Sequence, residues 1–114
     1  MEEIFIRLYA DCADACVAQD IAQSLLVRLH AHAPLLAKAP YRYWKMPELY
    51  GFELTLGQAS QAVFERLVAS PAQHWEHAGD QHDRSSVWNP APNGEHFLIP
   101  QARWAEVQFT VREA

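Results

Sequence analysis

The stretch that is richest in chemically active side chains is "HWEHAGDQHD", residues 74–83. It contains His74, His77 and His82, with Asp80 and Asp83 between and after them. Zinc and nickel sites are assembled from such imidazole and carboxylate groups. In a strand, a spacing of three puts the side chains of His74 and His77 on opposite faces, so a shared metal needs a turn between them. We therefore interpret these histidines as solvated loop residues and predict neither a metal ion nor another cofactor.

Two serines and two acid–base groups lie close together just after this stretch. Ser85 and Ser86 follow His82 and Asp83, but proximity along the chain is not the geometry of a catalytic triad. The G-x-S-x-G motif of the hydrolase nucleophile and any glycine-rich phosphate loop are missing from the sequence. The residue pattern favours a binding role over catalysis.

The two cysteines, Cys12 and Cys16, are four residues apart, which is not the C-x-x-C spacing of a redox motif. A thiol at a helix N-terminus can have its pKa lowered by the helix dipole, but a nucleophilic cysteine also needs a histidine base. We predict free, buried or half-buried thiols, and hence a reducing compartment. The acidic start "MEEIFIRLYADC" is unlike a signal peptide, and no apolar run approaches the length of a membrane span. The expected location is the cytoplasm.

The charge balance limits the kind of partner. The chain has 9 Lys and Arg against 14 Asp and Glu, for a net charge of -5. Nucleic-acid binding is disfavoured because phosphate contacts need a basic face. A basic protein partner suits this balance better.

The expected elements form one domain, residues 1–114. They are, in order, a strand at 4–9, a helix from Asp11 or Asp14 to about His32, strands at 41–46 and 49–56, a helix that opens at 57–60 and ends before Pro71, short strands around Trp75 and Val87, and a last strand at 103–113. This order predicts an α+β fold with a single-layer antiparallel sheet and two helices on one face. The closest described arrangement is ferredoxin-like, β-α-β-β-α-β, with an irregular or short-stranded insertion before the last strand.

Apolar periodicity indicates which helix face meets the sheet. In the first helix Val17, Ile21, Leu25 and Leu29 recur every four residues, as in an amphipathic helix. We therefore predict that this stripe packs against the sheet.

Tryptophan is abundant for a chain of this length, with four residues. We expect Trp44 to pack in the core. Trp104 shares its strand face with Glu106, which predicts a half-exposed ring. Trp88 precedes the turn-forming stretch "NPAPNG", which suggests a rigid aromatic presented at the surface. Large rigid rings of this kind are typical binding hot spots, and for Trp75, Trp88 and Trp104 the sequence leaves both an interface role and a structural role open.

Two C-terminal stretches, "SSVWN" at 85–89 and "RWAEVQF" at 103–109, resemble small bacterial immunity proteins of polymorphic and contact-dependent toxin systems. The resemblance implies a compact, acidic α+β domain that binds a cognate toxin domain, often a basic nuclease, and blocks its active site. It carries no functional residue over except Trp88 and Trp104.

We therefore predict a non-enzymatic protein whose partner-binding surface combines residues 72–101 with one face of the last strand. The predicted contact residues are Trp75, Glu76, Asp80, Asp83, Trp88, Trp104 and Glu106. The alternative is a homo-oligomeric ferredoxin-like protein that binds a small ligand or a metal in a cleft lined by His and Trp.

Overall fold

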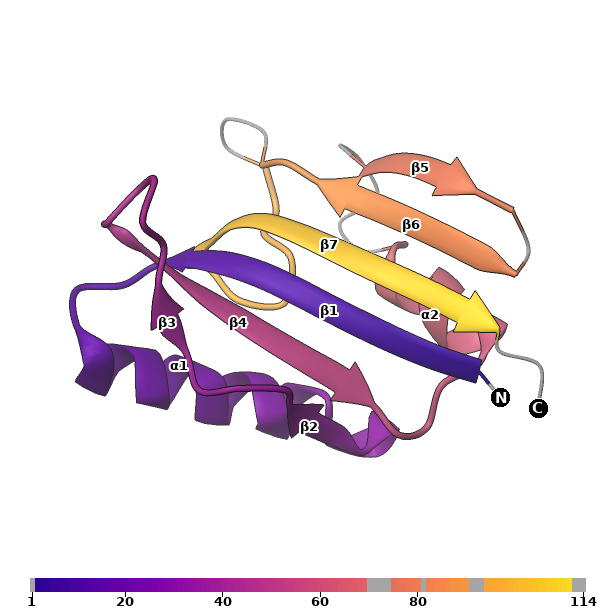
Figure 1. Ribbon diagram of the computed structural model, residues 1–114, viewed down its shortest axis with the longest axis horizontal. Helices are drawn as coiled ribbons and strands as arrows, with labels where there is room; N and C mark the ends of the chain where they lie inside the picture. Colours follow the sequence, from indigo (N-terminus) through magenta and orange to yellow (C-terminus); the bar gives the residue numbers. More distant parts are fainter. Residues whose placement is uncertain (1, 70–74, 81, 91–93, 112–114) are drawn as a thin grey trace.

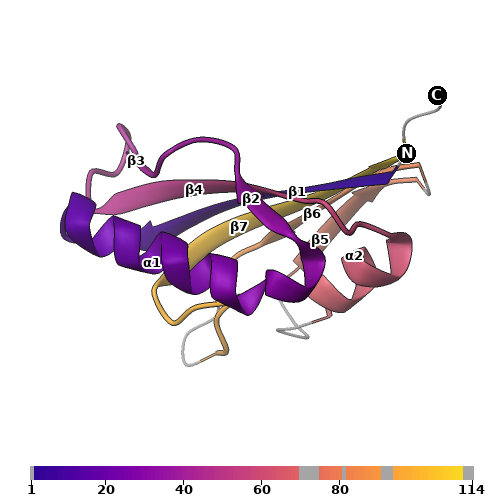
Figure 2. The ribbon, with the colours of Figure 1, turned by 90° about the horizontal axis from the view of Figure 1, so that it is seen from below.

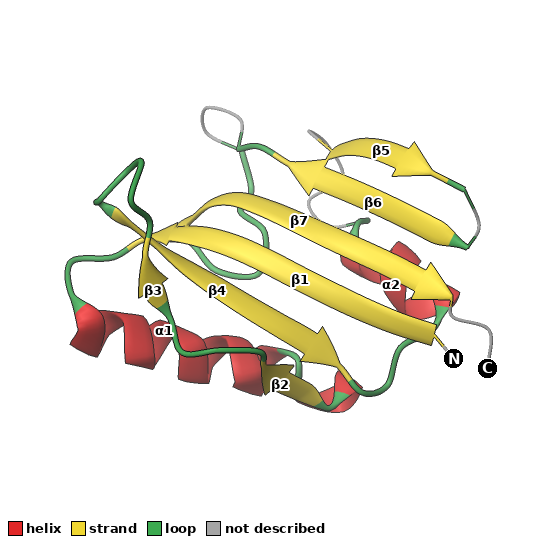
Figure 3. Cartoon of the chain, viewed as in Figure 1, coloured by secondary structure: helices red, strands yellow, loops and turns green. Residues whose placement is uncertain are grey.

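The computed structural model describes residues 2–69, 75–80, 82–90 and 94–111 and contains both strands and helices (Figure 1). The elements are β1 (Glu2–Asp11), α1 (Ala15–Arg28), the 3-10 turn η1 (His30–His32), β2 (Pro34–Leu36), β3 (Tyr41–Arg42), β4 (Leu49–Leu56), α2 (Gln61–Leu67), β5 (Trp75–Gly79), β6 (Asp83–Trp88) and β7 (Ala102–Val111). The fold is α+β, with one antiparallel sheet of seven strands and two helices (Figure 3).

The first strand lies at the centre of the sheet. The strand order is β2-β4-β1-β7-β6-β5, and β3 also pairs with β4. On β1, Ile6 lies opposite Leu54 of β4 and Val107 of β7, and all three side chains are buried. Both helices lie on the same side of the sheet, so the core forms between that side and the helices (Figure 2).

A capping side chain marks the N-terminus of each α-helix. Asp14 accepts a hydrogen bond from the backbone N–H of Val17 and so caps α1, while Ser60 caps α2 in the same way. The buried stripe of α1 runs through Ala18, Ile21, Ala22 and Leu25. Val17 is 38% exposed, so the prediction that it packs against the sheet was wrong. It lies in the first turn of α1, at the edge of the helix face that is buried.

The sequence prediction missed part of the sheet. Only Tyr41 and Arg42 of the expected strand 41–46 pair with β4, because the chain then turns, with the N–H of Leu49 donating to the carbonyl of Met46. The three-residue strand β2 was not predicted at all. The short strands expected around Trp75 and Val87 are confirmed as β5 and β6, an antiparallel hairpin that extends the sheet beyond β7.

One side of the sheet is left without a helix among the described residues (Figure 2). We call it the open face. Its side chains alternate along each strand with those of the core, and they are half-buried or exposed. They include Phe5, Arg7 and Tyr9 of β1, Trp104, Glu106 and Gln108 of β7, Val87 of β6, and Glu76 of the edge strand β5.

Candidate functional site

A row of side chains crosses five strands of the open face. Strand register places them in the order Glu53, Arg7, Glu106, Val87 and Glu76. Nη1 of Arg7 lies 4.0 Å from Oε1 of Glu106, at the limit of an ion pair. The row holds three carboxylates and one guanidinium, so its formal charge is negative.

Glu53 at the end of this row has two further partners. Nζ of Lys38 lies 3.1 Å from its Oε2, and the hydroxyl of Tyr41 donates to the same oxygen at 2.7 Å. Burial alone raises the pKa of Glu53, but the hydrogen bonds from Tyr41 and Lys38 outweigh it, and the net pKa lies below its ordinary value. Burial, followed by the hydrogen bond to Glu53, raises the pKa of Tyr41. Glu53 is thus held as a carboxylate.

Four aromatic rings follow one another beside the acidic row. We call Trp104, Tyr9, Tyr43 and Trp44 the aromatic ladder. The rings of Tyr9 and Trp104 are 5.3 Å apart, those of Tyr9 and Tyr43 stack at 4.5 Å, and Trp44 meets Tyr43 edge-on at 6.5 Å. The ladder leads from the sheet surface to Trp44, which is 79% exposed. The prediction that Trp44 packs in the core was therefore wrong, because the chain leaves the sheet after Arg42.

A groove of about 540 Å³ lies along the ladder. It is lined by Arg7, Tyr9, Tyr43, Met46, Leu49, Asn89, Arg103 and Trp104. Arg103 pairs with the carboxylate of Asp11. Nε of Arg7 is buried and has no hydrogen-bond partner. The groove thus combines aromatic walls with a buried guanidinium nitrogen, Nε of Arg7, that lacks an acceptor.

The structure brings together three of the predicted contact residues. Trp104 and Glu106 lie two residues apart on the open face of β7, and Glu76 follows in the row of Glu106. This confirms the half-exposed position of Trp104. Asp83 is the first residue of β6, and its side chain is exposed.

Asp80 lies in the turn between β5 and β6. Its Oδ1 accepts hydrogen bonds from the backbone N–H groups of His82 and Asp83, at 2.8 and 3.1 Å. These two hydrogen bonds lower the pKa of Asp80. The carboxylate therefore shapes the turn, although it remains exposed at the surface.

Trp88 is not at the surface, and its predicted role as an exposed anchor was wrong. It is 1% exposed and packs near Phe97, with ring centroids 6.4 Å apart. Its position in β6 points it to the helix side, opposite Ala105 and Trp75. Trp75 is half-buried on that side and meets Phe97 edge-on at 5.2 Å, so it is also away from the open face.

A serine–histidine pair exists that the sequence did not reveal. Nδ1 of His77 is 2.6 Å from Oγ of Ser86, which lies opposite it in register. Ser86 is 1% exposed, so this serine is a core residue that a substrate does not reach. The pair satisfies a buried hydroxyl.

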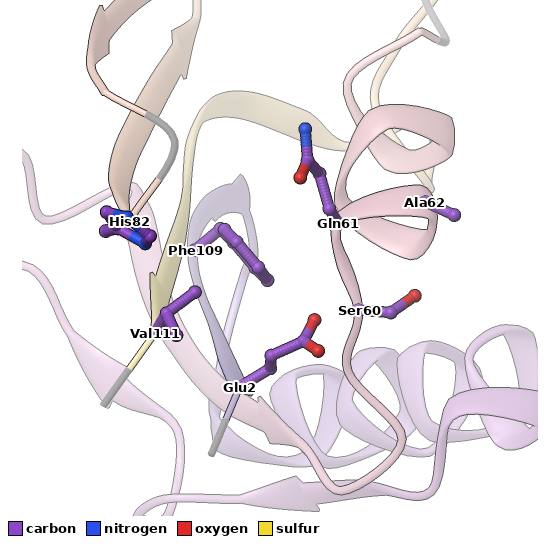
Figure 4. Close-up of a pocket in the computed structure, with 7 residues that line it drawn as sticks. All are labelled: Glu2, Ser60, Gln61, Ala62, His82, Phe109 and Val111. Carbon is purple, nitrogen blue, oxygen red and sulfur yellow. The ribbon is translucent and has the colours of Figure 1, made fainter. Parts of the chain in front are cut away.

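His96 meets the buried ring of Trp88 edge-on, with ring centroids 6.1 Å apart. His82 lines a shallow pocket of about 480 Å³, where Glu2 of β1 and Gln61 of α2 face the end of β7 (Figure 4). His74 lies outside the described residues. Within them, no group of three or more His, Cys, Asp or Glu side chains is placed to hold a metal ion.

The two thiols differ in exposure. Cys12 is buried and donates its S–H to the carbonyl oxygen of Asp14 at 3.1 Å, and burial raises its pKa. Cys16 is exposed, so the prediction of a buried or half-buried thiol was wrong there: its position on α1 faces away from the sheet. Cys12 is therefore not an activated nucleophile.

Neither α1 nor α2, the α-helices of the described ranges, has the length and apolar character of a membrane-crossing helix. No family model, curated protein or solved structure matches the chain.

Proposed function

We propose that this protein binds a partner protein through the open face, and that it is an immunity protein whose partner is a toxin domain. The proposal is supported by the resemblance of residues 85–89 and 103–109 to immunity proteins. Most of these two stretches lies in β6 and β7, and β7 carries Trp104 and Glu106 on the open face. In this role the protein acts in the cytoplasm, without catalysis.

The aromatic ladder is the single observation that carries the proposal. Trp44 is the most exposed large apolar side chain in the described residues, and its ring meets Tyr43 edge-on, while Tyr43 in turn stacks on Tyr9. Ring contacts of this kind restrict an exposed tryptophan, so less conformational entropy is lost when a partner buries it. Such rigid aromatic residues dominate the energy of many protein interfaces.

The carboxylates of the open face support a basic partner. Glu76, Asp83 and Glu106 belong to the same face, where Arg7 is the nearest opposing charge in the central row. A surface with this sign attracts a basic nuclease domain and speeds its association. The net charge of -5 acts in the same direction.

The ferredoxin-like description is part of the proposal. It is supported by the position of β4, which pairs antiparallel with both β1 and β2, so that the connection through α1 skips one strand. The connection from β4 through α2 to β7 also skips a strand, because β1 lies between them. Two such split units form the ferredoxin-like arrangement, with the β5–β6 hairpin as an addition.

The direct test pairs this protein with the toxin-like C-terminal domain encoded by the preceding open reading frame. The two purified domains should form a stoichiometric complex by calorimetry, and the complex should lack toxin activity. Trp44→Ala and Trp104→Ala should each weaken binding by about 2 kcal/mol.

Val27→Ala is the matched control, since Val27 is 67% exposed but lies on α1, on the other side of the sheet. It should leave the affinity unchanged. Full affinity in both tryptophan variants would reject the open face as the interface. A domain pair that fails to associate would reject the immunity function for that partner.

A further inference from the structure

The groove beside the aromatic ladder has the dimensions of a small-molecule site. Its volume of about 540 Å³ lies within the usual range of ligand pockets. Tyr9, Tyr43 and Trp104 supply aromatic walls, and Met46 and Leu49 add apolar surface. A flat apolar group would bury its faces against these side chains.

The polar groups of the groove select the charge of the ligand. The guanidinium of Arg103 is already neutralised by Asp11. Arg7 lies between Glu53 and Glu106 in the row, its contact with Glu106 is 4.0 Å long, and its buried Nε has no hydrogen-bond partner. Buried donors without partners are rare in native proteins and call for an acceptor. A carboxylate matches the fork of a guanidinium and would supply that acceptor.

We propose that this groove binds a small planar aromatic carboxylate, with the carboxylate on Arg7 and the ring among Tyr9, Tyr43 and Trp104. A single guanidinium with one nitrogen, Nε, left without an acceptor fits a monoanion better than a phosphate, which carries more charge. The aromatic walls disfavour a sugar acid, because its hydroxyls would lose their hydration without gaining partners. The groove shares Tyr9, Tyr43 and Trp104 with the aromatic ladder, so ligand binding is tested on the isolated protein, without the toxin domain.

The probe is 2-naphthoate, and its uncharged isostere 2-naphthamide is the ligand control. Calorimetry should give saturable binding at one site, and the amide should bind about tenfold more weakly or worse. In nitrogen–proton correlation spectra, the indole N–H of Trp104 should shift, while that of the buried Trp88 should stay in place.

Arg7→Gln should weaken 2-naphthoate binding about tenfold or more, and Arg7→Lys should weaken it less, because Lys keeps the charge but lacks the fork. Arg84→Gln is the matched control, since Arg84 lies over Phe64 on the helix side and pairs with Glu65. It should bind as the wild type does.

Thermal melting of each variant checks its fold, and the Trp104 signal of the wild type tests the site even where a variant unfolds. The proposal is overturned by equal binding of acid and amide, by an unshifted Trp104 signal, or by unchanged affinity in a folded Arg7→Gln.

Discussion

The ring of Tyr43 stacks on the ring of Tyr9, with centroids 4.5 Å apart and 14° between the planes. Tyr9 belongs to the central strand, whereas Tyr43 begins the loop that leads from β3 to β4. The backbone N–H of Tyr43 also donates to the carbonyl of Leu49 at 2.9 Å. The stack therefore ties this loop, with Trp44 at its tip, to the open face of the sheet.

Trp88 and Trp104 should differ sharply in what they contribute to stability. Trp88→Ala removes a ring that is 1% exposed and should lower the free energy of unfolding by about 3–5 kcal/mol. Trp104→Ala loses a half-exposed ring and its contact with Tyr9, and should lower it by about 1–2 kcal/mol. Urea denaturation of the two variants measures both values. Equal losses would contradict the assignment of the two rings to opposite sides of the sheet.

Gly51 should be intolerant of a side chain as long as Tyr41 is present. A Cβ on Gly51 would lie 2.4 Å from Cζ of Tyr41, so the ring would have to move and give up its hydrogen bond to Glu53. Gly51→Ala should therefore lower the free energy of unfolding by about 1–2 kcal/mol.

The control for this clash is the same substitution in a Tyr41→Ala background. There the three atoms nearest to the added methyl group, all of the Tyr41 side chain, are removed, and Gly51→Ala should cost close to nothing. A double-mutant cycle measures the coupling. An equal cost in both backgrounds would locate the strain in the backbone of β4 instead of in the Tyr41 ring.

Elements with one buried face could be predicted from the sequence. β4 and β7 alternate apolar and polar residues, and the cap residues Asp14 and Ser60 mark where the helices begin. Their patterns are local, so a short window of sequence contains all the information that the prediction needs. For the same reason the half-exposed position of Trp104 could be inferred from its polar strand neighbours.

The side of the sheet on which Trp88 lies could not be predicted, because β6 does not alternate in the usual way. Its core-facing positions include Arg84 and Ser86, two polar residues. Both are accommodated by residues distant in sequence: Arg84 lies over the ring of Phe64, 4.9 Å from its centroid, and Ser86 meets His77. The face of Trp88 follows from pairing with β7, and a local pattern does not contain that register.

The pKa of Glu53 predicts how stability depends on pH. Its folded pKa lies below the ordinary value of 4.5, so ionised Glu53 stabilises the fold above that value. The contribution is lost as the pH falls through the lower, folded pKa. Glu53→Gln should therefore be less stable than the wild type by about 1 kcal/mol near neutral pH, and the difference should shrink in acid.

Denaturant titrations at about pH 7 and about pH 3 measure this change. Glu48→Gln serves as the control, since Glu48 is exposed in the loop before β4. It should follow the wild type at both pH values. A stability difference for Glu53→Gln that is the same in acid would show that packing, and not charge, holds this side chain.

The acidic open face should steer a basic partner during association. Glu76→Gln together with Asp83→Asn removes two exposed charges of this face, and the association rate at low salt should fall several-fold. The dissociation rate should change little, because exposed charges at the rim of an interface act mainly before docking. The salt dependence of association should also become weaker, since fewer charges remain to be screened.

Glu2→Gln with Asp20→Asn is the matched control, because it changes the net charge equally at exposed positions on the helix side of the sheet. Stopped-flow measurements with the toxin domain at several salt concentrations compare the two pairs. A control that slows association as much as the open-face pair would mean that net charge alone attracts the partner and that the acidic row has no directing role.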